Sequence, residues 1–403
     1  MRFFVLKCWI FVCLCPLSSA ANVARESPWR VVGYYASWSL YERNFELSHV
    51  PGDRLTHLVY AFAKISPAGE CIAGDPWADT GRPNPDGHPS PRSGGNFGQL
   101  HELRRKYPNL KVLLAIGGWT WSAMFSDVAR TPASRNAFAA SCARFMRRHG
   151  FDGLDVDWEY PVAGGLEPGR PEDKHNYTLL LSALRRQLDA QAQDHAERRY
   201  LLTAAVPAGL DKIGNIEPGE FHPYLDWINI MAYDFSGAWS PLTGFVAPLF
   251  APATAETERS PPSAAAAVEA YLATGVPPEK VVLGLPFYGR GWEGVPADNE
   301  GLFQPHTGAA EGSGKHGVFG FRHLMRDYVP TMKRHWHDAA KAAWLYDPQA
   351  RLMISYEDTE SVSAKVDYVK GRKLGGIMAW ELSQDTEGEM SLLETIWEEL
   401  RGD

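Results

Sequence analysis

Residues 151–161 read FDGLDVDWEYP, and acidic side chains recur at every second position in the second half of this stretch. Because successive side chains of a β-strand point to opposite faces, Asp155, Asp157 and Glu159 are expected on one face of a strand. The alternating positions are apolar or aromatic, which is typical of a strand with a buried outer face. These positions are Phe151, Leu154, Val156 and Trp158. The stretch therefore predicts a strand that carries a row of carboxyl groups.

A row of three carboxyl groups is costly in a purely structural strand. Like charges in a partly buried place raise the pKa of at least one group and reduce stability. Catalysis can use this arrangement, because a carboxylic acid that stays protonated near neutral pH can act as a general acid, and its neighbours can stabilise positive charge. A solvated acidic loop end or a cation site is the alternative interpretation. The apolar framing argues against a loop.

Eight short runs rich in valine, isoleucine and aromatic residues alternate with helical patterns along the chain. Eight strands that alternate with helices indicate a TIM (β/α)8 barrel, which is an α/β fold. In this fold, catalytic groups lie at the carboxyl ends of the strands, where Glu159 is expected. The predicted strands are 30–36, 57–64, 111–118, 153–159, 200–207, 226–234, 281–289 and 375–382.

One interval, from residue 290 to about residue 356, is too long for a single crossover between a strand and its helix. We therefore predict an inserted subdomain at 290–356 within a barrel domain at 22–403. A second long segment, 75–98, is rich in proline and glycine and is predicted to be a loop on the active-site side.

The composition excludes some classes of partner. The 403 residues are 45% apolar, 12% aromatic and 22% charged, with a formal net charge of −8, which is an ordinary globular profile. A nucleic acid would need a local basic patch. The densest basic stretches, 104–106, 144–148 and 185–186, lie in helical patterns and are interpreted as solvated faces. We expect no nucleic-acid partner.

The amino terminus resembles a signal peptide, because Arg2 precedes an apolar run and small residues follow up to Ala21. The run is short for a transmembrane span. We therefore predict that residues 1–21 are removed and that the protein is secreted, extracellular and free of the membrane. Cys71 and Cys142 would remain in the mature chain. They could form a disulfide with each other or stay as buried free thiols, and the sequence does not decide between the two. Asn176 starts a glycosylation sequon.

The run D-G-L-D-V-D-W-E at 152–159 is similar to the signature of glycoside hydrolase family 18, the chitinases and their non-catalytic relatives. The third predicted strand, KVLLAIGGW, resembles the second family signature, except that Ala115 replaces a serine. Gly117 and Gly118 in that strand are expected to let backbone and sugar approach closely. The insertion at 290–356 coincides with a small domain that many family members carry, so the resemblance implies a small α+β insertion between strand 7 and helix 7 of a catalytic barrel.

The resemblance implies catalytic roles for four residues. Glu159 would protonate the leaving glycosidic oxygen and then act as base for water. The acetamido oxygen of the substrate would attack C1, and Asp157 and Tyr233 would stabilise the resulting oxazolinium ion. Asp155 would share a proton with Asp157, so the two should titrate as a coupled pair.

The resemblance also implies a sugar-binding cleft at the strand ends. Taken alone, Met231 and Tyr233 would be interpreted as core residues and Trp380 as a buried indole. Aromatic faces stack on the apolar faces of pyranose rings, which suits tryptophans just past strand ends. The implied substrate-binding residues are Tyr34, Trp119, Tyr160, Met231, Asp234, Trp239, Arg290 and Trp380.

These features together lead to the hypothesis of a secreted, monomeric chitinase that cleaves β-1,4 links between N-acetylglucosamine units in chitin and chitooligosaccharides with retention. A non-catalytic chitin-binding lectin and an endo-β-N-acetylglucosaminidase acting on N-glycans are the alternatives. No cofactor and no metal are expected, because metal-spaced clusters, a phosphate loop and a G-x-S-x-G elbow are absent from the sequence. The sequence leaves endo or exo action open.

Overall fold

The computed structural model describes residues 29–83, 94–194, 199–252 and 262–401. The predicted signal peptide at 1–21 lies outside these residues. Within them, eight parallel strands close into a barrel, because β1 pairs with both β2 and β15. This confirms the predicted TIM (β/α)8 fold. The barrel strands are β1 (Arg30–Ala36), β2 (His57–Ile65), β4 (Lys111–Gly117), β5 (Gly153–Asp157), β6 (Leu201–Pro207), β7 (Trp227–Met231), β8 (Val281–Pro286) and β15 (Gly376–Trp380).

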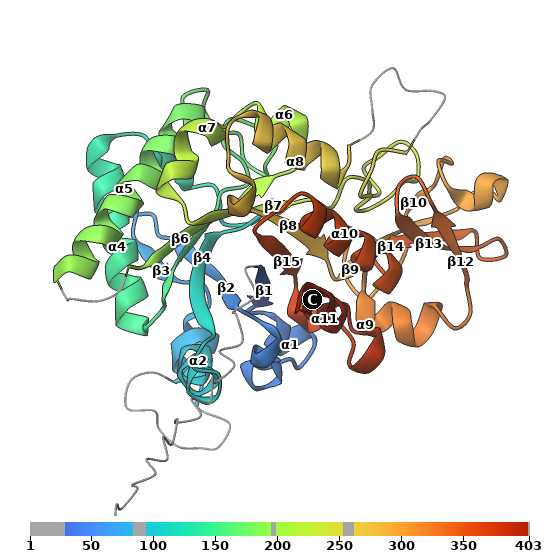
Figure 1. Cartoon of the computed structure of the whole chain (residues 1–403), viewed down its shortest axis with the longest axis horizontal. Helices are drawn as coiled ribbons and strands as arrows, with labels where there is room; N and C mark the ends of the chain where they lie inside the picture. Colours follow the sequence, from blue (N-terminus) through green and yellow to red (C-terminus); the bar gives the residue numbers. More distant parts are fainter. Residues whose placement is uncertain (1–28, 84–93, 195–198, 253–261, 402–403) are drawn as a thin grey trace, which may run out of the picture.

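Helices surround the barrel, as Figure 1 shows for α2, α4, α5, α8 and α10. The strands are buried almost without interruption, as expected where parallel strands have side chains inside the barrel and helices outside it. The helices of the described chain are α1 (Ser39–Glu42), α2 (Gly95–Lys106), α3 (Phe125–Ala129), α4 (Pro132–His149), α5 (Asp173–Asp194), α6 (Leu210–Ile213), α7 (Pro218–Phe221), α8 (Ala264–Ala273), α9 (Phe321–His323), α10 (Thr359–Gly371) and α11 (Leu392–Arg401).

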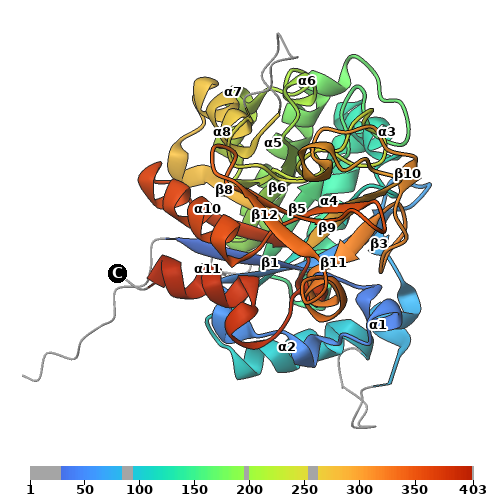
Figure 2. The same cartoon turned by 90° about the vertical axis from the view of Figure 1, so that its right-hand side faces the viewer.

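A second sheet lies between β8 and α10, at one side of the barrel (Figure 2), and it confirms the predicted α+β insertion. Its strands pair antiparallel, so each can be joined by a short connection. In spatial order they are β10 (Gly308–Ala309), β9 (Tyr288–Glu293), β14 (Leu352–Tyr356), β13 (Ala342–Asp347) and β12 (Lys333–His337), with β11 (Val318–Gly320) beside β9.

Several predicted strands end earlier in the structure, and three of these ends lie close to the predicted site residues or to the second sheet. β5 stops at Asp157, so Glu159 lies in the loop just beyond the strand. β7 stops at Met231, and Asp234 has a positive φ of 57°, so the predicted two-residue alternation does not continue through Asp234. The predicted strand 281–289 divides into β8 and β9, because the chain leaves the barrel there and enters the second sheet.

The carboxyl row nevertheless faces inward, as predicted from the alternation. Asp155 stands on β5 between Ala115 of β4 and Thr203 of β6 in register. Ala115 belongs to the apolar cluster that fills the barrel interior, whereas Leu154 and Val156 belong to the core between the strands and the helices. The barrel therefore presents the acids of β5 to its own interior.

The two cysteines of the described chain are buried free thiols rather than a disulfide. Cys71 lies on β3 (Cys71–Ala73), an antiparallel extension of β2, and Cys142 lies on α4. Burial and the neighbouring Cys71 raise the pKa of the Cys142 thiol well above its ordinary value. In the part of the chain that is described, no helix is both long and apolar enough to cross a membrane.

Gly117 at the end of β4 has a structural role that differs from the predicted contact with sugar. Its φ is +106°, and a Cβ there would lie 2.2 Å from the Asp157 carbonyl oxygen. A Cβ added at Gly118 would instead clash with the Phe62 ring. The absence of a side chain at Gly117 therefore allows the end of β4 to approach the strand that carries the acids.

We expect Gly117→Ala to lower the free energy of unfolding by about 2–4 kcal/mol, since it adds backbone strain and a clash with the backbone. Gly371→Ala is the matched control, because a Cβ there meets no atom within 4 Å, and it should change stability by less than about 1 kcal/mol. Urea unfolding of both variants measures the difference. Equal stabilities would contradict this role of Gly117 in β4.

Candidate active site

Asp155 is the innermost acid of the row and is fully buried. The Tyr34 hydroxyl donates a 2.7 Å hydrogen bond to one carboxylate oxygen, and the Thr203 hydroxyl donates to the other. The Asn229 amide donates to the same oxygen as Thr203 at 3.4 Å. Burial raises the pKa of Asp155 to about 6, and the three donors act in the opposite direction. Donors from β1, β6 and β7 thus hold one carboxyl in place.

Asp157 is the middle acid, and it is buried with an unsatisfied oxygen. Its Oδ1 has no hydrogen-bond partner, which is uncommon for a buried carboxyl. Burial, with the charges of Glu159 and Asp155, raises the pKa of Asp157 well above its ordinary value. A buried oxygen of this kind suits a donor that arrives with a ligand.

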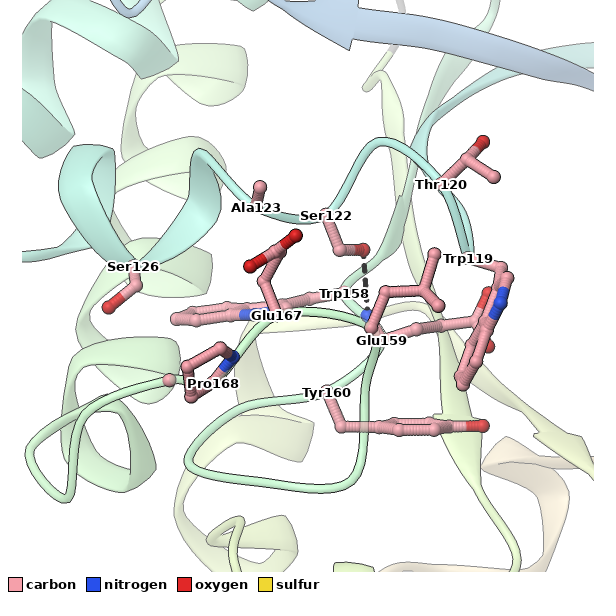
Figure 3. Close-up of a pocket in the computed structure, with 12 residues that line it drawn as sticks. Trp119, Thr120, Ser122, Ala123, Ser126, Trp158, Glu159, Tyr160, Glu167 and Pro168 are labelled. Atoms are coloured by element: carbon pink, nitrogen blue, oxygen red, sulfur yellow. Dashed lines mark hydrogen bonds between the residues drawn. The ribbon is translucent and has the colours of Figure 1, made fainter.

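Glu159 is half-buried at the mouth of the barrel. Its backbone N–H donates a 2.8 Å hydrogen bond to the Ser122 hydroxyl, drawn as a dashed line in Figure 3. Burial raises the pKa of Glu159 to about 7, and a side-chain hydrogen bond with Tyr160 acts against this shift. The charge of Asp234 raises it further. The group can therefore hold a proton near neutral pH, as a general acid requires.

Tyr233 and Asp234 follow β7, which only β6 separates from the acid-bearing strand β5. Burial raises the pKa of Tyr233 well above its ordinary value, and the charges of Asp157 and Glu159 add to the shift. Asp234 accepts hydrogen bonds of 2.9 Å and 2.7 Å from two nitrogens of Arg290. The Arg290 guanidinium also lies 5.0 Å from the centre of the Trp239 ring. Arg290 of β9 thereby joins the second sheet to the site.

Aromatic rings line the site on two sides. The Trp380 ring lies 5.6 Å from Tyr34 and 6.1 Å from Trp38, between ring centres. Opposite these, Trp119 meets Tyr160 edge to face at 6.5 Å. Trp119 is 46% exposed and Trp239 is 58% exposed, so both could stack on a ligand.

The predicted site residues fall into one neighbourhood. Met231 is 8% exposed and packs in the interior apolar cluster that also contains Tyr34, and Tyr160, Tyr233 and Trp380 pack against the same cluster. The choice between Tyr34 and Tyr35 is clear in the structure, because the Tyr35 hydroxyl donates to the Phe45 carbonyl and not to Asp155.

A pocket opens beside Glu159, with Trp119 and Tyr160 near one end and Ser126 and Pro168 near the other (Figure 3). Glu167 also lines it. Among the described residues, no group of three histidines, cysteines or acids is placed to hold a metal ion. The site itself presents carboxyls, hydroxyls and aromatic faces.

Sequence reasoning missed several residues of this site. Trp38 lies two residues past the end of β1, and the rule that tryptophans past strand ends suit sugar subsites would have found it. Thr203 and Asn229 are polar residues inside otherwise apolar strands, which is a usable signal. Ser122 gave no signal, because its bonds to Glu159 and to the Asp157 carbonyl depend on how the loop after β4 folds.

Comparison with known proteins agrees with this geometry. Residues 30–385 match the sequence profile of glycosyl hydrolases family 18. The chain is 40% identical to Chitinase A1 of Niallia circulans over 92% of its own length and 58% of that protein. It superimposes on chitinase ChiA74 from Bacillus thuringiensis with a TM-score of 0.89 at 35% identity, covering 93% of this chain and 70% of the other.

A class V chitinase from Nicotiana tobaccum, whose structure was determined in complex with NAG4, also has this fold. The TM-score is 0.79 at 32% identity, and the match covers 92% of this chain and 98% of the other. Fold and acidic row together define a glycoside hydrolase. The chain belongs to glycosyl hydrolase family 18, as an enzyme of the chitinase group.

The raised pKa of Glu159 predicts a pH-dependent stability. Between the unfolded pKa of about 4.3 and the folded pKa of about 7, the folded state keeps a proton that the unfolded state loses, so stability falls as pH rises. The glutamine of Glu159→Gln does not titrate, so the variant does not lose this stability as the pH rises. We expect the variant to gain on the order of 1–3 kcal/mol relative to the parent between pH 4 and pH 7.5.

Denaturant unfolding at a series of pH values measures this gain. Glu167→Gln, which removes an exposed carboxyl of the same pocket, is the matched control. A Glu159→Gln difference that stays constant over the whole pH range would contradict the buried, protonated state of Glu159.

Proposed function

We propose that the protein is a secreted, monomeric chitinase that hydrolyses β-1,4 links between N-acetylglucosamine units with retention of the anomer. The observation that carries the proposal is the buried Oδ1 of Asp157, which lacks a partner between two further carboxyls. An acetamido N–H of the substrate would satisfy it. The chitinases that this chain resembles and the NAG4 complex of its tobacco relative support this substrate class.

In the proposed first step, Glu159 gives its proton to the leaving glycosidic oxygen as the bond from that oxygen to C1 breaks. The acetamido carbonyl oxygen of the same sugar forms a bond to C1, which produces an oxazolinium ion. Asp157 accepts a hydrogen bond from the acetamido N–H and stabilises the positive charge, while the Tyr233 hydroxyl donates to the acetamido oxygen. No enzyme carboxylate attacks C1, in contrast to the common two-carboxylate scheme.

In the proposed second step, Glu159 is ionised and removes a proton from water as that water attacks C1. The ring of the oxazolinium ion opens, the acetamido group is restored, and Glu159 is protonated again. Attack occurs on the face that the leaving group occupied, so the anomer is retained. Asp155 supports the cycle by sharing a proton with Asp157 under the control of Tyr34, Thr203 and Asn229.

The proposed cleft extends beyond the acids along exposed aromatic rings. Trp380 contacts Trp38, and Tyr41 lies on the short helix α1 that begins after Trp38. The Tyr41 ring stacks on Trp77 at 6.1 Å, and the two residues are 55% and 54% exposed. A chain of several sugars could follow this path.

We expect Glu159→Gln to lower turnover of the N-acetylglucosamine hexamer at least about 10³-fold, because the proton donor is lost while the shape remains. The affinity for the hexamer should change by only a few-fold. Product chromatography and calorimetry measure the two effects, and Glu389→Gln, which removes an exposed carboxyl that does not line the pocket, should behave as the parent does.

Three other results would contradict this expectation, and each points to a different conclusion. Near-parental turnover by Glu159→Gln would refute the assigned proton donor. A parent protein that binds the hexamer without cleaving it would be a lectin. Cleavage of N-glycans on a glycoprotein, with the hexamer left intact, would identify the endo-β-N-acetylglucosaminidase instead.

We expect Trp77→Ala to lower activity on long chitin chains several-fold, consistent with about 1 kcal/mol of lost ring stacking. Activity on the trimer should be unchanged, because short chains end before Trp77. Trp77→Phe keeps a ring and should lose less. Initial rates on colloidal chitin and on the trimer test this, and equal losses on both substrates would refute an extended cleft.

A further inference from the structure

A buried ion pair lies outside the catalytic machinery. Lys365 of α10 is 1% exposed and Glu357 is 2% exposed. The Lys365 ammonium donates to Glu357 Oε1 and, at 2.6 Å, to the Ala247 carbonyl oxygen. The Ser361 hydroxyl donates to the second Glu357 oxygen. Burial lowers the pKa of Lys365 and raises that of Glu357, so burial works against the charges of both. An apolar pair of the same volume would often be at least as stable.

The pair joins three segments that are distant in sequence. Glu357 directly follows β14 of the second sheet, Lys365 lies on α10, and Ala247 lies in the connection between β7 and α8. In Figure 1, α10 lies between the barrel and the second sheet. The segment around Ala247 has a second attachment close to Glu357, since the Val246 N–H donates a 2.9 Å hydrogen bond to Ser355 Oγ of β14.

The segment that contains Val246 and Ala247 lies directly behind residues of the site. Phe235, the residue after Asp234, donates its N–H to the Val246 carbonyl at 3.0 Å. Val246 and Ala247 form an apolar cluster with Tyr288, and Tyr233 and Trp380 pack against that cluster. A displacement of Val246 and Ala247 would therefore shift Tyr233, the proposed donor to the acetamido group, and Trp380, the proposed floor of the cleft.

We propose that Lys365 and Glu357 are positioning residues, which hold the segment 245–249 so that Tyr233 and Trp380 keep their places in the cleft. The ammonium is suited to this because its N–H donors are directional and can serve the Glu357 carboxylate and the Ala247 carbonyl together. An apolar pair would fill the same volume without fixing that carbonyl. The roles of Tyr233 and Trp380 rest on the proposed function.

The test uses the double variant Lys365→Met/Glu357→Leu, which removes both charges and leaves no unpaired ion. Arg334→Met is the matched control, because Arg334 lies at the same junction and its ion pairs are with Asp358 and Glu360 rather than with the segment 245–249. Two quantities are measured: amide hydrogen exchange of peptides covering 231–249, and kcat and KM on the N-acetylglucosamine hexamer.

For a folded double variant, we expect faster exchange in 231–249 and a fall in kcat of about 10-fold or more, with a smaller change in KM. The control should keep the parental values of both. A folded double variant with parental exchange and parental kcat would overturn the proposal. Hydrogen exchange needs no turnover, so an inactive parent would refute the proposed function and still leave the positioning role decided by exchange.

A second variant covers the case in which the double variant does not fold. Ser355→Ala removes the acceptor of the Val246 N–H and leaves the ion pair intact. The proposal predicts faster exchange in 231–249 and a lower kcat for this variant also. Unchanged kcat with faster exchange would show that the placement of this segment does not reach the chemistry, and the proposal would fall.

Discussion

The burial of the three carboxyl groups of Asp155, Asp157 and Glu159 in one row is the constraint on which the rest of the structure depends. Three carboxyl groups at alternate positions, partly or fully removed from water, cannot all be ionised without a large cost. The barrel gives Asp155 three donors from three strands, and burial raises the pKa values of all three acids. Burial, together with the charge of Asp234, keeps a proton on Glu159, the group placed to donate it.

The surrounding architecture supports this row at increasing distance. β4 approaches the end of β5 because Gly117 has no side chain, and Ser122 in the following loop bonds the backbone of Glu159. The second sheet contributes Arg290, which fixes Asp234 beside the site. Further out, the buried pair of α10 ties this sheet to the segment behind Tyr233. The site is therefore assembled from strand ends, a loop and an insertion rather than from one element.

The sequence predicted what depends on local periodicity. Alternation around Asp155 located β5 and its inward face, and apolar runs located the other barrel strands to within a few residues. The donors Thr203 and Asn229 were not predicted. Their contact with Asp155 depends on the register between neighbouring parallel strands, which cannot be read from one stretch of sequence. The free state of Cys142, and the position of Glu159 beyond the strand end, likewise depend on tertiary packing.

The most direct test of the proposed mechanism is the anomer composition of the first products from the N-acetylglucosamine hexamer, resolved by chromatography before mutarotation equalises the anomers. Participation of the acetamido group and return of water to the same face predict an early excess of the β-anomer. An early excess of the α-anomer would mean direct displacement by water, and it would contradict the proposed roles of Asp157 and Glu159.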